Sequence, residues 1–422
     1  MLNGRFATKI NIAVRSISRQ FLGMYPQALK NIELRKLFIA QLPADFSDWL
    51  DFVAIGALLA FVWDAPSFAY AALAVGLGAP YLVIGPFAGV FVDRWSIKSV
   101  LIYSNLGRAI VTGTFFFAGD WTTLIVLVTV RSSVDCFFTP AKQAAIQALT
   151  TKENRTSANG LSHGINQASK IVAPSAGGAF LIWFAPDVIF ILNSIISASA
   201  AAFALRLNKI ERKSFQDENS SDSVLTGVKN GMAIVRQSPV IKTALFMMAI
   251  SYFAIFIYDT FIAPLTRNLN FEQQHLGYAL AAVGIGGVCG SMLFSLLPNV
   301  KYPQYWVAAG ATLSAIILLI LGTFDSSNAD MSTVLLISLF LTLGFATAMS
   351  VVPVRIVLQN TVPEERMGSV TALSEAANTT ALLSAPFLGA VLVDTFSVGV
   401  PFIVGGIVIF IVAIIALRLK LD

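Results

Sequence analysis

Ionisable side chains stand inside long apolar runs of this chain, and they are the residues that could do chemistry. The first run holds three acids at intervals of three residues, Asp45, Asp48 and Asp51. Charged groups are costly to bury in lipid and mark candidate functional positions where they occur. Burial favours a protonated carboxyl group and a nearby cation favours a carboxylate, so such groups could exchange protons. The others selected on this basis are Arg108, Arg131, Asp135, Lys170, Asp259 and Glu375.

Two interpretations of the charges in the first half stay open. In one, permanent ion pairs fix the register of neighbouring helices, which suits Arg108 and Asp45. In the other, protonation of a carboxyl group releases a pair with Lys170 or Arg131, and the substrate or a second conformation takes its place. Arg131 and Asp135 are four residues apart and could pair along one helix. We assign the exchanging role to Asp48, Asp51, Asp135 and Lys170.

Two acids of the second half are candidates for substrate binding or proton coupling. Asp259 follows Tyr258 in the aromatic run ISYFAIFIYDTF, and aromatic faces around an acid suit a cationic or aromatic ligand. A second interpretation pairs Asp259 with Arg267 at the membrane interface. Glu375 is expected in the first turns of a helix, where it could instead stabilise the helix dipole.

The composition places these charges in a membrane protein. The chain is 56% hydrophobic and 12% charged, whereas soluble domains have about 25% charged residues. Cys136 and Cys289 form no disulfide framework, and His163 and His275 lack metal-ligand spacing. We therefore expect that the protein binds no cofactor or metal and is not an enzyme. Membrane orientation accounts for the net charge of +5, so we expect no nucleic-acid partner.

Apolar runs of about 20 residues can each cross a bilayer, and their number predicts an all-α fold with twelve transmembrane helices. A basic arm (1–36) precedes six helices (37–206), and a polar linker (207–240) leads to six more (241–422). Nearly all of the 28 Lys and Arg then fall on one side of the membrane. The positive-inside rule assigns this side, which also holds both termini, to the cytoplasm. The expected spans are 37–63, 67–92, 98–118, 121–141, 157–182, 186–206, 241–266, 275–297, 304–323, 332–353, 368–393 and 396–417.

The two halves are copies of one unit. At an offset of 212 residues, Gln147 meets Gln359, Asn166 meets Asn378, and Ala173-Pro174 meets Ala385-Pro386. A period of half the chain is typical of transporters that carry substrate between two repeats. The sequence thus predicts two pseudo-symmetric six-helix bundles.

The turn after the second span, GPFAGVFVDRWSIK, resembles a loop signature of the major facilitator superfamily. Gly85 and Gly89 could let helices approach closely, and Ser96 replaces the second glycine of the signature. The resemblance implies a latch that holds one conformation closed. The latch residues are Gly89, Asp93, Arg94 and Lys98.

The fifth span resembles the antiporter motif of the same family, with Ser169 and Ala173 in place of two glycines. Pro174 is expected to bend this helix, and the resemblance implies export. Arg131 is similar to the mid-membrane arginine of the family, which is thought to tune proton transfer. The residues of the helix-bending motif are Gly160, Pro174, Gly177 and Gly178.

The chain as a whole resembles the drug and siderophore exporter branch, the enterobactin exporter type in particular. The resemblance implies proton-coupled efflux of an amphipathic small molecule across the inner membrane by a monomer in contact with membrane lipid. A lysophospholipid flippase with weak proton dependence and a non-transporting membrane receptor are the other functions considered.

Overall fold

The computed structural model describes residues 30–210, 238–295, 302–327, 330–362 and 364–418. Throughout these ranges the regular structure is helical, as the all-α prediction requires. The chain divides into two compact units, while the predicted arm and linker lie largely outside the described residues. The first unit falls within Met1–Ile55, Pro80–Ser214 and Ser295–Pro298, and the second within Gly56–Ala79, Phe215–Phe294 and Asn299–Asp422.

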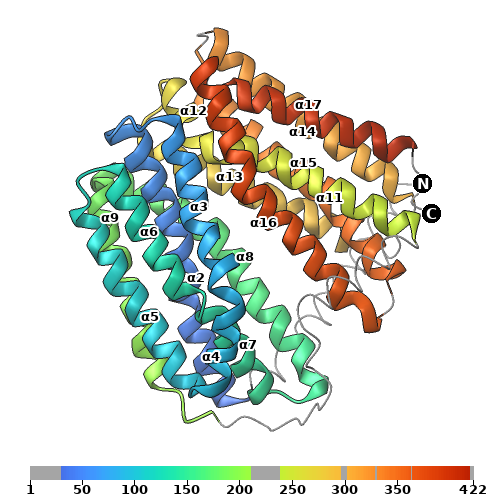
Figure 1. The fold of residues 1–422 in the computed structure, drawn as a ribbon. Coiled ribbons are helices and arrows are strands. Elements are labelled where there is room, and N and C mark those ends of the chain that lie inside the picture. The colour runs from blue at the N-terminus through green and yellow to red at the C-terminus, as the bar shows by residue number, and fades with distance from the viewer. Residues whose placement is uncertain (1–29, 211–237, 296–301, 328–329, 363, 419–422) are drawn as a thin grey trace, which may run out of the picture. The chain divides into compact units, whose positions relative to one another are not determined.

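The first unit is a bundle in which α5 and α9 run side by side (Figure 1). Larger apolar residues such as Phe38 and Val100 interleave with alanines such as Ala141 and Ala145 in its core. Helices suit an apolar medium because they satisfy their own backbone hydrogen bonds. The elements, of which α2 and α3 extend into the second unit, are α2 (Ile32–Ala57), α3 (Ser67–Val83), α4 (Gly85–Arg94), α5 (Ile97–Thr114), η2 (Phe115–Phe117), α6 (Trp121–Asp135), α7 (Phe138–Leu149), α8 (Lys152–Trp183) and α9 (Pro186–Leu205).

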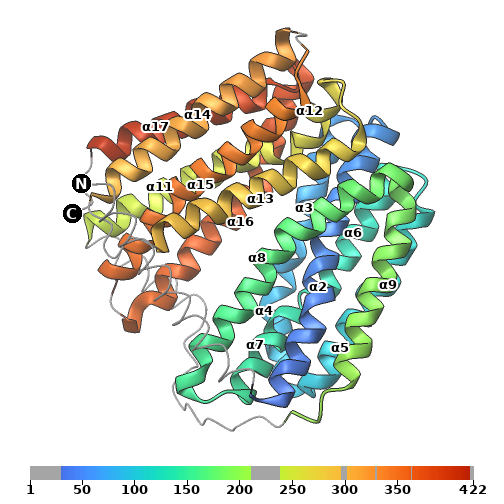
Figure 2. The ribbon, with the colours of Figure 1, turned by 180° about the vertical axis from the view of Figure 1, so that it is seen from behind.

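In the second unit, α14 packs along both α15 and α17, and α11 packs along α16 (Figure 2). Glycines allow helices to cross closely: a Cβ on Gly286 would collide with the carbonyl group of Leu341, and one on Gly344 with that of Val283. The elements are η1 (Leu58–Val62), α11 (Pro239–Tyr258), η3 (Asp259–Phe261), α12 (Ile262–Asn268), α13 (Gln273–Ser295), α14 (Pro303–Ser327), α15 (Thr333–Thr361), α16 (Glu364–Thr395) and α17 (Val400–Arg418).

Residues 56–79 belong to the first half of the sequence, yet they cluster with the helices of the second unit. Asp64 forms an ion pair with Arg267 at the end of α12, and the rings of Phe68 and Phe387 lie 5.7 Å apart. The hydrogen bond from Arg267 holds the pKa of the exposed Asp64 carboxyl group below its ordinary value. These contacts connect the segment from the α2–α3 loop to the start of α3 with other helices of the second unit.

Nine helices in the described ranges are long and apolar enough to cross a membrane. The three remaining predicted spans coincide with α2 and η1, with α3 and α4, and with α8. α2 and α8 contain several ionisable residues, and α3 has only 17 residues, so they are less typical spans. The order of helices agrees with the prediction, and the count of twelve spans stays a prediction.

The internal repeat is also a structural repeat. α8 and α16 each contain 32 residues and an internal proline, Pro174 or Pro386. A Cβ on Gly177 would lie 3.1 Å from Leu50 of α2, and one on the matching Gly389 would collide with the carbonyl group of Ile257 in α11. In each half the long proline-containing helix therefore packs closely against the first helix.

Candidate functional site

The three aspartates of α2 each meet a cation from another helix of the first unit. Asp45 Oδ1 lies 3.6 Å from Lys142 Nζ of α7, and Asp48 forms an ion pair with Arg108 of α5. Asp51 Oδ2 lies 3.0 Å from Arg131 Nε of α6. We call these residues, together with Asp135, the charge cluster: Asp45, Asp48, Asp51, Arg108, Arg131, Asp135 and Lys142.

Arg131 joins two of the α2 acids. Its Nη2 lies 2.5 Å from Asp48 Oδ1, while its Nε contacts Asp51 and also donates to Thr112 Oγ1 at 3.3 Å. A planar guanidinium group can satisfy two acceptors at once, which a lysine cannot do with fixed geometry. Arg131 therefore fixes the spacing between α6 and one face of α2.

Arg108 is fully buried and is the second arginine that Asp48 contacts. Its Nη1 lies 3.2 Å from Asp135 Oδ1, and its Nη2 donates to the carbonyl oxygen of Ala44 at 3.0 Å. The guanidinium carbon also lies 5.2 Å from the ring centre of Phe138. Arg108 thus connects α2, α5, α6 and α7.

The predicted pair between Arg131 and Asp135 along α6 is wrong. Among the ion pairs of the described residues, Asp135 pairs with Arg108, and Tyr81 donates a hydrogen bond to Asp135 Oδ2 at 2.5 Å. The physical reason is that Arg131 extends toward the α2 acids, where two carboxylates are in reach, and leaves Asp135 to a different arginine.

Neutral side chains complete the coordination of the acids, and sequence reasoning missed them. Asn193 of α9 donates to Asp51 and, at 2.9 Å, to the carbonyl oxygen of Ser47. Gln41 Nε2 donates to Asp45 Oδ2 at 2.7 Å and to the carbonyl oxygen of Ser162 at 2.8 Å. An amide side chain within a strongly apolar run is the signal that could have identified them.

Lys142 is the largest departure from the sequence prediction in this site. The predicted fourth span ends at residue 141 and would leave Lys142 in the following loop, but the chain turns at Cys136 and continues as α7 to Leu149. Lys142 is buried there and faces Asp45. Its charge therefore belongs to the cluster and not to the positive loops.

Exposure separates the acids of the cluster. The side chain of Asp48 is 29% exposed, whereas those of Asp45 and Asp51 are 3% and 4% exposed. Asp48 is therefore the α2 acid that water or a ligand can reach most easily.

Lys170 of α8 lies beside the cluster. Its Nζ is 4.8 Å from the ring centre of Trp49, the residue next to Asp48, which is a cation–π contact. The exchanging role of Lys170 stays a prediction.

The two candidate acids of the second unit, Asp259 and Glu375, belong to η3 and α16. Asp259 begins η3, at the break between α11 and α12, while Tyr258 is buried with its ring 5.3 Å from that of Phe402. Tyr258 therefore packs in the core of the second unit, and the role of Asp259 stays a prediction. Arg267 pairs with Asp64.

Glu375 is not in the first turns of its helix, because α16 begins at Glu364. The dipole interpretation of Glu375 is therefore wrong. It is exposed and, with Arg355, Ser374 and Thr371, lines a cavity of about 220 Å³.

The residues of the two family-like motifs are helical. Gly89, Asp93 and Arg94 lie in α4 and Lys98 lies in the first turn of α5, so the turn itself is Trp95-Ser96. The predicted close approach at Gly85 and Gly89 is absent, since a Cβ at either position would have no described neighbour within 4 Å. A Cβ on Gly160 would likewise have no described neighbour within 4 Å. Gly177 and Gly178 are buried, and Pro174 lies inside α8.

Comparison with known proteins identifies the family. The chain is 26% identical over 392 residues to the MFS-type transporter YfiS of Bacillus subtilis, covering 91% of this chain and 92% of that protein. It is 24% identical over 345 residues to Macrolide efflux protein A of Streptococcus pyogenes, covering 80% and 83%. The crystal structure of the nucleoside transporter NupG aligns with a TM-score of 0.72 at 14% identity, covering 92% and 99%, which shows the fold.

The family model of the Major Facilitator Superfamily matches residues 37–378 and 244–422. The matched ranges include both halves of the internal repeat and all charged residues described above. The chain belongs to the Major Facilitator Superfamily and is an integral membrane transporter.

Proposed function

We propose that this protein exports an amphipathic small molecule by alternating access and that proton entry drives the export. The observation that carries the proposal is the position of Asp48, which is partly exposed and contacts both Arg108 and Arg131. One reachable carboxyl group thus contacts two arginines that connect four helices, α2, α5, α6 and α7.

The charge balance of the cluster supports proton binding. Its four carboxylates outnumber its three cations when all are ionised. An uncompensated charge in an apolar medium is costly, so uptake of one proton brings the cluster to neutrality. Protonation of Asp48 also weakens its pairs with Arg108 and Arg131. We propose that this loosening couples protonation to the movement of α2 against α5 and α6, with Asp51, Asp135 and Lys170 as exchange partners.

Export is favoured over import by two observations. A relative covering 80% of the chain carries the name Macrolide efflux protein A. The antiporter-like motif also has its helix-bending Pro174 inside α8, and Gly177 packs against α2, which bears the acids. Drugs such as macrolides, or siderophores, are the proposed substrates.

The second unit would supply the substrate contacts. Glu375 and Arg355 line one cavity, so a substrate with both positive and negative groups would find a partner for each. Asp259 stands at the break between α11 and α12, which η3 bridges, and we propose it as a second substrate or proton-coupling group. Gly89, Asp93, Arg94 and Lys98 are proposed to act as the conformational latch on the side of the α4–α5 turn, where the proposed topology places the cytoplasm.

Transport into inside-out vesicles tests this function. A labelled macrolide, a labelled siderophore, a cationic dye and a lysolipid would be tested with a proton gradient and again after an uncoupler collapses it. We expect the macrolide or another amphipathic compound to accumulate only with the gradient and to release protons from the vesicles. Lysolipid movement that ignores the gradient would instead identify a flippase.

Variants connect this activity to the cluster. Asp48→Asn is expected to abolish gradient-driven accumulation while leaving the protein folded. Asp187→Asn is the matched control, because Asp187 lies at the start of α9 in the same unit and outside the cluster. Gradient-driven transport that survives in Asp48→Asn, Asp51→Asn and Asp135→Asn would overturn the proposed coupling site.

A further inference from the structure

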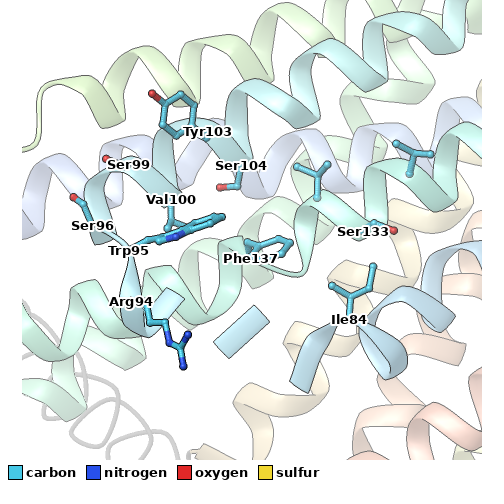
Figure 3. A pocket seen from close by; sticks show the side chains of 12 residues that line it. Ile84, Arg94, Trp95, Ser96, Ser99, Val100, Tyr103, Ser104, Ser133 and Phe137 are labelled. Atoms are coloured by element: carbon cyan, nitrogen blue, oxygen red, sulfur yellow. The ribbon is translucent and has the colours of Figure 1, made fainter. Parts of the chain in front are cut away.

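A groove on the first unit lies apart from the charge cluster, and Arg94 at its mouth is also one of the proposed latch residues. It has a volume of about 920 Å³ and is bounded by the end of α4, the first half of α5 and the last turns of α6 (Figure 3). We propose that this groove binds one anionic phospholipid, with the phosphate at Arg94 and an acyl chain between α5 and α6.

The polarity of the groove changes along its length. Arg94, Trp95 and Ser96 lie at one end, and Ile84 lies at the other (Figure 3). The walls between them include Val100 and Val130. A phospholipid has the same order of groups, with a charged head at the membrane surface and a long apolar chain behind it.

The hydroxyl groups in the deeper part of the groove are already engaged. Ser133 donates to the carbonyl oxygen of Thr129 at 2.8 Å, and Ser104 donates to that of Leu101 at 3.4 Å. The deeper walls therefore present mainly apolar surface, which suits a hydrocarbon chain and not a polar solute.

The mouth of the groove has the chemistry of an anionic headgroup site. Arg94 is exposed and is the charged side chain among the described lining residues. The Ser96 side chain makes no capping hydrogen bond to α5 and can donate to a phosphate oxygen. Trp95 is 56% exposed, and tryptophan is enriched where membranes meet water.

Position in the chain favours a lipid of the leaflet beside the α4–α5 turn. The turn joins two helices expected to cross the bilayer, so Arg94 lies at a membrane surface and Val130 lies deeper. Basic pockets between transmembrane helices at this depth recognise anionic lipid headgroups. Charge complementarity therefore selects an anionic lipid over a zwitterionic one.

Native mass spectrometry of the detergent-solubilised full chain tests the proposal. The protein would be titrated with dioleoyl phosphatidylglycerol and, separately, with dioleoyl phosphatidylcholine. We expect one molecule of phosphatidylglycerol to stay bound at collision energies that remove phosphatidylcholine.

Two variants locate the bound lipid. Arg94→Gln should weaken phosphatidylglycerol binding about five-fold, the effect of one basic group near a membrane surface. Val130→Trp should fill the groove and reduce lipid retention about ten-fold or more. Arg206→Gln removes an exposed charge from the end of α9 in the same unit, and Ile110→Trp enlarges an exposed residue of α5 outside the groove. Both controls should bind phosphatidylglycerol as the unchanged protein does.

Each outcome bears on the proposal. Equal retention of the two lipids would overturn the anionic assignment, and retention unaffected by Val130→Trp would overturn the groove as the site. If Arg94→Gln does not fold, as judged by size-exclusion chromatography, the comparison of Val130→Trp with Ile110→Trp decides the location on its own. Transport activity is not measured, so failure here leaves the proposed export function untouched.

Discussion

Arg131 binds two carboxylates that stand three residues apart on α2: its Nη2 lies 2.5 Å from Asp48 Oδ1 and its Nε lies 3.0 Å from Asp51 Oδ2. One acid is partly exposed and the other is almost completely buried. The same guanidinium group therefore links a reachable carboxylate to a buried one.

Removal of Arg131 should destabilise the protein through the charge that it leaves behind. Loss of one member of a buried ion pair costs about 3–5 kcal/mol, because the remaining charge is uncompensated. We expect Arg131→Met to lower the melting temperature in detergent, and the double variant Arg131→Met with Asp51→Asn to recover part of the loss. Arg206→Met, at the exposed end of α9, is the control and should change little. An unchanged melting temperature in Arg131→Met would contradict a structural role for these pairs.

Asp48 should be the α2 acid most reactive toward a carboxyl reagent. Its side chain is 29% exposed, against 3% for Asp45 and 4% for Asp51. We expect a membrane-permeant carbodiimide to modify Asp48 first, as measured by peptide mass spectrometry over time. Asp48→Asn should remove this fast modification without increasing that of Asp51. Equal rates at Asp48 and Asp51 would show that exposure does not distinguish them.

The sequence predicted the parts of this structure that repeat or that depend on one helix alone. The offset of 212 residues identified Pro174 and Pro386, and both lie inside helices of 32 residues. Ionisable residues in apolar runs identified the two arginines and the acids of the cluster. These features follow from composition and spacing, which are local properties of the chain.

The ion-pair partners of the cluster residues could not be predicted from the sequence, because they depend on how each helix is rotated about its axis relative to its neighbours. Arg131 has Asp135 one turn away on its own helix, yet it contacts acids of α2 while Asp135 meets Arg108. Lys142 follows the predicted span 121–141 directly, yet α7 extends to Leu149 and brings it to Asp45. In each case contacts between helices decided the outcome, and a single sequence does not contain them.

Substitution of Gly286 should disrupt the crossing of α13 and α15. A Cβ there would collide with the carbonyl oxygen of Leu341, which is a backbone atom and cannot rotate away. We expect Gly286→Ala to cost about 1–3 kcal/mol, as overpacking does, measured as a loss of melting temperature and of folded yield.

Gly160→Ala is the matched control for that prediction. Gly160 lies in α8, and a Cβ on it would meet no described atom within 4 Å. Alanine favours a helix over glycine by about 1 kcal/mol, so this variant should be as stable as the unchanged protein or more stable. Equal losses at Gly286 and Gly160 would indicate that the glycine contacts do not set stability.

The start of α6 should respond to acid through Asp120, which lies between two predicted spans. Asp120 accepts hydrogen bonds from Thr122 and from the backbone N–H of Thr123 at 2.9 Å, and these bonds lower its pKa from 3.8 to about 2. Because the pKa is lower in the folded protein, the carboxylate stabilises the fold above about pH 4, and this contribution disappears as the pH falls toward 2. The melting temperature of Asp120→Ala should therefore lie below that of the unchanged protein at pH 6, and the difference should shrink with acidification.

Asp120→Asn keeps a capping oxygen without the titrating charge, so its melting temperature relative to Asp120→Ala should not vary over the same range. A gap between the unchanged protein and Asp120→Ala that stays constant from pH 6 to the lowest pH at which the protein remains folded would show that the charge of Asp120 does not contribute.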